Sequence, residues 1–301
     1  MLFNKDNSGS SELHRLTGLY YASNDFSAIA PEINAATRVV ATMVGKDVIK
    51  KAEDEYMGAN PDMVLLDAVR LPIACLAICN WAKQNLISHE DTGRKMKVDE
   101  SEKTPFEWMV DRDDRELREK YYRAMDALYS HLEVTEDWEH PVLKDSLIKS
   151  LAELEWVFPV EGSYYCFYMM LPLFVEVQRT KLKRFLGAEK YESLLKSHDS
   201  GLEYPVRRFV VLEALTIAVK RWSLSAFPLM IARRFSPSYQ GNRESSAASI
   251  EEMEWYLNEL AVQSSVAREE ILEELAQGEN RWKDVAVIPE NDRRNKFFNA
   301  G

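Results

Sequence analysis

The chain has few cysteines and no pattern that would make them a disulfide framework or a metal site. It contains three among 301 residues, an odd number that argues against a set of structural disulfides. Cys75 and Cys79 are four residues apart in the apolar run LPIACLAIC. This spacing puts both on one helix face, where a free thiol behaves as a small hydrophobic side chain. We therefore expect buried thiols and a reducing compartment.

The sequence also lacks the motifs that accompany common catalytic chemistry. It has no glycine-rich phosphate loop, no G-x-S-x-G, no H-E-x-x-H and no C-x-x-C. Its five histidines are scattered in polar contexts, which is typical of solvated surface positions. No titratable pair stands out as an acid–base couple. We expect no catalytic, cofactor-binding or metal-binding residues and interpret the chain as a non-enzyme, although an enzyme assembled from residues distant in sequence remains an alternative.

Long hydrophobic runs are missing too. The apolar run Leu71–Cys79 is much shorter than the roughly 18 residues that cross a bilayer. The first residues, MLFNKDNSGSSELHRL, lack the apolar segment of a signal peptide. We expect a soluble protein that is made in the cytoplasm and has no membrane partner.

Positive charge is in deficit. There are 38 basic and 49 acidic residues, giving a net charge of −11. This argues against a protein that grips nucleic acid phosphates, which usually needs a basic face. It does not exclude one that surrounds DNA without gripping it. The length suggests about two domains, and 46% hydrophobic residues are enough for a substantial core.

What the sequence does contain is helical periodicity. After Asn60-Pro61-Asp62, a typical helix start, apolar residues recur at three- and four-residue steps as far as Trp81. Strand-like alternation is rare. The pattern predicts an all-α protein, with a small β-hairpin around Gly93 in the polar connector 88–103.

Two segments resemble each other. MVGKDVIKKA (43–52) and FLGAEKYESLL (185–195) share an apolar pair, a glycine and an amphipathic continuation. Further landmarks follow in the same order and at nearly equal spacings. The three pairs are Gly45 and Gly187, Trp81 and Trp222, and Trp108 and Trp255. We predict an internal duplication of a helical bundle, with the glycines in left-handed conformations at helix ends and the tryptophans as core anchors.

This repeat divides the chain into five parts. They are an irregular N-terminal arm (1–27), a first helical unit (28–135), a bridge (136–167), a second helical unit (168–277) and an irregular tail (278–301). The tail is apolar for an irregular segment, and we expect it to dock on a partner or on the chain itself. Its candidate docking residues are Trp282, Val285, Ile288, Phe297 and Phe298.

The order of elements also resembles a known family. The residues concerned are APEINAATRVVATMVGKDVIKKA, the apolar helix LLDAVRLPIACLAICNWAKQN, the connector ISHEDTGRKMKVDE and the helix FEWMVDRDDRELREKYYRAMDALYSHLE. Together they resemble the helical head–tail connector, or adaptor, proteins of tailed bacteriophages, above all the long forms in phages of Bacteroides-like hosts. The resemblance covers 28–135, with a weaker echo in 168–277.

The resemblance implies a structural virion protein of the neck region. Its expected partners are further copies in a ring, a portal protein and tail or neck proteins, with DNA passing nearby without specific binding. A negatively charged wall suits that passage because it repels phosphates. The family brings no catalytic residues. The alternative is a cytosolic all-helical adaptor, a monomer or dimer that binds a partner peptide or helix in a groove between its two units.

Overall fold

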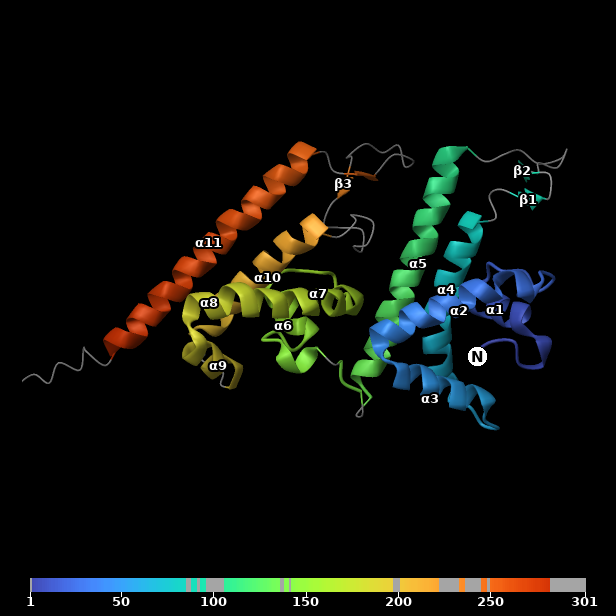
Figure 1. Ribbon diagram of the computed structural model, residues 1–301, viewed down its shortest axis with the longest axis horizontal. Coiled ribbons are helices and arrows are strands. Elements are labelled where there is room, and N and C mark those ends of the chain that lie inside the picture. Colours follow the sequence, from blue (N-terminus) through green and yellow to red (C-terminus); the bar gives the residue numbers. More distant parts are fainter. Residues whose placement is uncertain are drawn as a thin grey trace, which may run out of the picture.

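The structure is a computed structural model, and it describes residues 2–84, 88–90, 93–95, 106–135, 138–140, 142–196, 201–221, 233–235, 245–247 and 250–281 (Figure 1). The chain is all-α, as the helical periodicity predicts. Within the described residues, extended backbone pairs only in two short antiparallel ladders. One joins Ser88–Glu90 to Gly93–Lys95, which is the hairpin predicted around Gly93.

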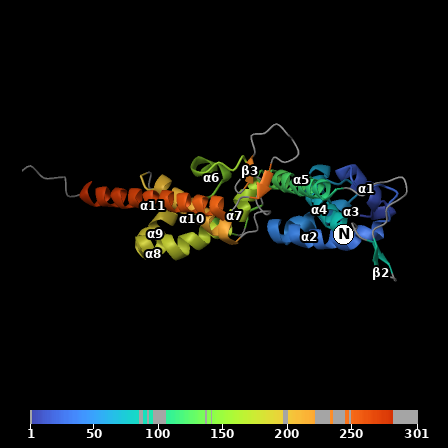
Figure 2. The same ribbon diagram turned by 90° about the horizontal axis from the view of Figure 1, so that it is seen from above.

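The helices form two bundles that lie side by side (Figures 1 and 2). The first bundle comprises residues 2–135. Its elements are η1 (Lys5–Asn7), α1 (Gly9–Thr17), α2 (Phe26–Val44), α3 (Lys46–Met57), α4 (Met63–Gln84), β1 (Ser88–Glu90), β2 (Gly93–Lys95) and α5 (Glu107–Glu133).

The second bundle comprises residues 142–281. Its elements are η2 (Leu143–Asp145), α6 (Leu151–Val157), α7 (Tyr164–Val177), the π-helix η3 (Gln178–Leu182), α8 (Lys183–Leu186), α9 (Ala188–Lys196), α10 (Glu203–Arg221), β3 (Arg233–Phe235), β4 (Ser245–Ala247) and α11 (Ile250–Arg281). When α7, η3 and α8 are counted as one helical segment, the elements follow the same order as in the first bundle. The duplication itself remains a prediction.

Helix α4 is the centre of the first bundle. Asp62 caps its start, because its side chain accepts hydrogen bonds from the backbone N–H groups of Val64 and Leu65. Pro72, Cys75 and much of the helix are buried among α1, α2, α3 and α5. The buried cysteines confirm the expectation for LPIACLAIC. Helix α4 is also long and apolar enough to cross a membrane, but the core helix of a globular bundle has the same character.

The helix that precedes each glycine corner buries one stripe of side chains. In α2 the stripe is Ile29, Ile33, Ala36, Val40 and Val44. In α7, η3 and α8, which run on as one helical segment, most of α7 is buried, and the corresponding stripe is Met170, Phe174, Val177, Leu182 and Leu186. The two stripes have the same steps except between the third and fourth members, where the second has one residue more. The wider turn of the π-helix accommodates that extra residue, as π-bulges do.

Gly45 and Gly187 each separate two helices with no other residue between them. Their φ angles are positive, +100° and +82°, with extended ψ angles of 147° and 163°. This region is nearly closed to residues with a Cβ. The glycines therefore do make helix–helix corners, but they lie in this extended positive-φ region rather than in the predicted left-handed helical region.

Each bundle also buries an arginine that joins its central helix to its first helix. Arg70 on α4 has a nitrogen 3.1 Å from Glu12 Oε1 on α1, without hydrogen-bond alignment. Arg207 on α10 has a nitrogen 2.8 Å from Glu153 Oε1 on α6 and 2.7 Å from Glu203 Oε1. A buried guanidinium needs such partners. We take Arg207 as the counterpart of Arg70, and this pair aligns α10 with α4.

Three predicted boundaries are wrong. The segment 1–27 is not an irregular arm, because it contains η1 and α1 and buries Leu2, Phe3 and Leu13. The bridge 136–167 is not separate from the second unit, because α6 packs against α10 and α7 begins at Tyr164. The tail does not begin at residue 278, because α11 continues to Arg281.

Candidate functional site

A groove on the first bundle lies between α2, α4 and α5, and the start of α7 occupies part of it. The pocket there has a volume of about 580 Å³ and includes Met43, Leu76, Tyr121 and Tyr122 in its lining. The second bundle contributes Tyr165 and Met169 from α7. The Tyr165 ring stacks on that of Tyr122, with centroids 5.0 Å apart. A helix of the second bundle therefore docks in a groove of the first.

Helix α5 provides most of the docking surface. Asp126 Oδ1 accepts a hydrogen bond from the backbone N–H of Tyr165 at 2.7 Å and from Ser163 Oγ at 3.0 Å. A carboxylate suits the positive end of the α7 dipole. Burial raises the pKa of Asp126, and these hydrogen bonds work against that rise. These hydrogen bonds therefore orient the start of α7 on α5, in addition to the apolar packing.

One turn further along, aromatic rings extend the contact. The rings of Tyr129 and Tyr168 stack with centroids 4.4 Å apart. The Tyr168 hydroxyl donates to Glu133 Oε1. Trp138 and His140 close the cluster against Tyr168. Burial lowers the pKa of His140 and raises that of Glu133, because it disfavours the charged form of each group. His140 is only half-exposed, which contradicts the expectation of a fully solvated histidine.

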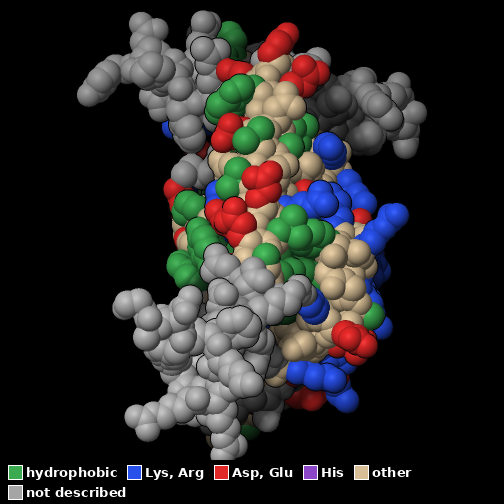
Figure 3. All heavy atoms as spheres, turned by 90° about the vertical axis from the view of Figure 1, so that its left-hand side faces the viewer, with side chains coloured by type: hydrophobic (Ala, Val, Ile, Leu, Met, Phe, Trp, Pro, Cys, Tyr) green, Lys and Arg blue, Asp and Glu red, His purple; other side chains and the backbone are tan. Residues whose placement is uncertain are grey.

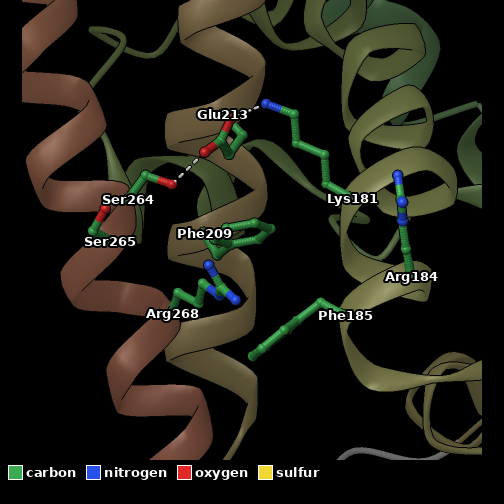
Figure 4. Close-up of a pocket in the computed structure, with 8 residues that line it drawn as sticks. All are labelled: Lys181, Arg184, Phe185, Phe209, Glu213, Ser264, Ser265 and Arg268. Carbon is green, nitrogen blue, oxygen red and sulfur yellow. Dashed lines mark hydrogen bonds and ion pairs between the residues drawn. The ribbon is translucent and has the colours of Figure 1, made fainter.

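The second bundle has a groove of its own between η3–α8, α10 and α11 (Figure 4). Its pocket has a volume of about 500 Å³. Its lining comprises Lys181, Arg184, Phe185, Phe209, Glu213, Ser264, Ser265 and Arg268. All eight residues belong to the second bundle, and no described helix enters this groove as α7 enters the first.

Polar contacts cross the floor of this groove. Glu213 on α10 accepts a hydrogen bond from Ser264 Oγ at 2.6 Å and forms an ion pair with Lys181 (Figure 4). The Arg268 guanidinium lies 5.0 Å from the centre of the Phe185 ring. Among the described residues, neither Arg184 nor Arg268 has a carboxylate partner. Two exposed cations are therefore available to an incoming acidic group.

Figure 3 shows the left-hand side of the view in Figure 1, the end of the molecule formed by the second bundle. Acidic and hydrophobic side chains run down the middle of that face, and Lys and Arg side chains gather on one side of them (Figure 3). The basic residues near the groove come from η3 and α8, which include Arg179, Lys181, Lys183 and Arg184. Of these, Lys181 and Arg184 line one wall of the pocket.

The two grooves occupy corresponding places. One buried stripe of α5 is Leu117, Tyr121, Ala124, Leu128 and Leu132, beside which Tyr122, Met125 and Tyr129 are buried too; the buried stripe of α11 is Leu260, Ser264, Ala267, Ile271 and the partly buried Leu275. These stripes have identical steps. We call two positions matched when they take the same place along corresponding stripes. Ser264 and Ser265 of the second groove then match Tyr121 and Tyr122 of the first.

The remaining walls agree with this match. When Gly187 is aligned with Gly45, three residues of the second pocket match three that line the first. These are Lys181 with Val39, Arg184 with Thr42, and Phe185 with Met43. In the register set by Arg70 and Arg207, Glu213 matches Leu76. The grooves thus share a position but differ in chemistry: the first is largely apolar and holds α7, while the second is polar and open among the described residues.

The predicted landmark tryptophans lie at different depths. Trp81 is partly buried against the core, with its ring 5.1 Å from that of Tyr20. Trp108 and Trp255 are 45% and 68% exposed, so the prediction that they anchor the core is wrong. Both lie in the first turns of their helices, beyond the buried stripes. Trp222 is outside the described residues.

The predicted docking tail is also outside the described residues. This applies to all five candidates, Trp282, Val285, Ile288, Phe297 and Phe298, whose role stays a prediction. The structure instead draws attention to residues that the sequence analysis missed. Tyr165, Tyr168 and Asp126 carry the contact between the bundles, and Arg184 and Arg268 line the open groove.

One sequence signal could have located the matched helices. Pro31 and Pro172 stand within α2 and α7 at matched positions, and Phe26 and Phe167 precede them by the same number of residues. Because η3 contains one extra residue, the two members of each of these pairs are one residue closer in the sequence than Gly45 and Gly187.

Comparison of the chain with family models, with curated protein sequences and with solved structures gave no match.

Proposed function

We propose that this chain is a structural assembly subunit, a head–tail connector of the tailed-bacteriophage kind, built from two copies of one helical unit. The observation that carries the proposal is the docking of α7 from the second bundle in the groove of the first. It is an association of two like units, head to tail, within one chain. A contact of this type leaves an unused groove on one unit and an unused helix face on the other, and so can continue from copy to copy.

The assembly would be a ring or series of copies in the neck of the virion, with a portal protein and tail or neck proteins as further partners. DNA would pass nearby without specific binding, as the net charge of −11 suggests. A basic wall facing the DNA path would argue against this part of the proposal. The chain would then act through its surfaces rather than through catalysis.

Mass measurement by light scattering tests the proposal. The full-length chain, alone or mixed with candidate portal proteins, should form species of several copies. A shortened chain that lacks residues 282–301 keeps all of α11 and tests the predicted docking tail separately. A full-length chain that stays monomeric at every concentration, and also with portal proteins, would contradict the connector function.

A second function is favoured by the pocket between the bundles. Its lining from α4, α5 and α7 includes the thiol-bearing Cys79, Tyr121 and Met169, and its apolar character suits a partner helix or peptide. An adaptor of this kind would remain a monomer or dimer and bind one ligand per chain. Light scattering in the presence of a binding peptide separates this outcome from a growing assembly.

A further inference from the structure

The face of α5 that receives α7 has a matched and exposed face on α11. On α5 the relevant residues are Tyr122, Asp126 and Tyr129, of which the two tyrosines are buried. On α11 the matched residues are Ser265, Glu269 and Leu272, and all three are exposed. Leu272 is 47% exposed. An acid thus stands where Asp126 caps α7, and a large apolar side chain stands where Tyr129 stacks.

The helix that would enter such a groove also has a matched and exposed face. Tyr168 and Met169 of α7 match Ser27 and Ala28 of α2, and Tyr165 matches Asn24. Tyr165 and Tyr168 are buried against the first bundle, whereas Ser27 and Ala28 are exposed and Asn24 is half-exposed. These small side chains allow a helix to approach closely. The backbone oxygens of Asn24 and Asp25 accept hydrogen bonds from Ser10 and Tyr20, whereas the side chains of Ser27 and Ala28 stay open.

We propose that the start of α2 in a second copy of this chain docks in the groove of the second bundle, between η3–α8, α10 and α11. This inference rests on the proposed assembly function and specifies its interface. The contact repeats between chains the contact that α7 makes within one chain. The interface is heterologous, so each copy offers a groove at one end and a helix at the other.

The charges of the two surfaces favour this occupant. Asp25 precedes α2 and accepts hydrogen bonds from the backbone and side chain of Ser27. These bonds lower its pKa, so it is ionised at neutral pH. The second groove holds Arg184 and Arg268, which have no carboxylate partner among the described residues. The incoming helix start therefore brings an acid toward unpaired cations.

Cross-linking between engineered cysteines tests the proposed register. Tyr165 stacks on Tyr122 within the chain, so Asn24 of one copy should meet Ser265 of the next. The double variant Asn24→Cys/Ser265→Cys is treated with a short bis-maleimide. The three natural cysteines are buried, and burial raises the pKa of the Cys75 thiol to about 11 and that of Cys166 to about 12. They should react slowly, and wild-type chain reports their background.

The control moves one cysteine to the adjacent residue. Val266 is exposed, but it matches Arg123, whose side chain is 81% exposed and is therefore not covered by α7. We expect a ladder of covalent multimers from Asn24→Cys/Ser265→Cys and at least a tenfold weaker ladder from Asn24→Cys/Val266→Cys. Helical circular dichroism and light scattering of each variant before treatment verify folding and assembly.

The outcomes separate the interface from the wider function. A ladder confined to the Ser265 pair supports the proposed interface. Equal ladders, or none although light scattering shows multimers, would overturn the interface and leave the assembly function standing. A chain that is monomeric with and without portal proteins and gives no ladder would overturn both.

Discussion

Deleting Thr180 should leave the second bundle almost as stable as before, although the residue lies inside a helix. The π-helix Gln178–Leu182 adds one residue to a stripe that otherwise matches α2. Removal of Thr180 would convert this wide turn into an ordinary α-helical turn. Leu182 and Leu186 would then remain on the buried side. The side chain itself is exposed and donates a hydrogen bond to the carbonyl oxygen of Glu176.

The matched deletion in the first bundle should be far more harmful. Arg38 is exposed in α2, and its helix has no extra residue to lose. Each residue of an α-helix advances the side-chain direction by about 100°, so Val40 and Val44 would turn away from the core. Both are at most 2% exposed. Burying one valine contributes about 1.5–3 kcal/mol, and the two together give a loss of roughly 3–6 kcal/mol for the Arg38 deletion.

For the Thr180 deletion we expect a loss below about 1 kcal/mol, as for ordinary surface changes. Guanidinium denaturation followed by circular dichroism measures both variants, and hydrogen exchange of peptides from 164–186 and 26–44 locates the change. A chain of two bundles need not unfold in one cooperative step, so the local exchange data are the stricter measure. A Thr180 deletion as destabilising as the Arg38 deletion would refute the view that η3 contains an inserted residue.

Two further predictions concern the corners and the aromatic cluster. Gly45→Ala and Gly187→Ala should each lower the free energy of unfolding by about 1–3 kcal/mol, since their positive φ angles disfavour a Cβ; a loss no greater than that of the surface change Val266→Ala would contradict this. The pKa of His140 is lowered by burial in the folded state, so the folded chain binds this proton more weakly than the unfolded chain. Its contribution to stability should be present above the unfolded pKa of about 6.5 and be lost as pH falls below it. Denaturation midpoints between pH 7 and pH 5 should therefore fall less in His140→Asn than in the wild type, and equal slopes would exclude this role for His140.

The sequence predicts the helices well because helical periodicity is a local property. The apolar steps of 63–84 produce the buried helix α4, and the spacing of Cys75 and Cys79 places both thiols in the core. Gly45 and Gly187 mark corners because few other residues adopt their backbone angles. These features depend on neighbouring residues alone, and the order of elements follows from them.

The sequence is less reliable for register. The apolar pattern of an amphipathic helix nearly repeats after one turn. Two alignments of such helices that differ by four residues therefore match almost equally well. The tryptophan pair Trp108 and Trp255 differs by one turn from the match of the buried stripes. The contacts of Arg70 with Glu12 and of Arg207 with Glu153 decide the register between central helices. Such contacts join residues that are far apart in the chain.

The candidate site illustrates the same division. In the sequence, Arg184 ends the basic run RTKLKR and Tyr165 lies in the aromatic stretch GSYYCF. The tertiary structure places Arg184 with Phe185 and Arg268 in an open groove, and it packs Tyr165 against Tyr122 of the other bundle. By itself the sequence determined which segments are helical and where they turn, because those depend on local periodicity and backbone freedom. Only the packing of helices decided which faces are covered and which remain open to a partner.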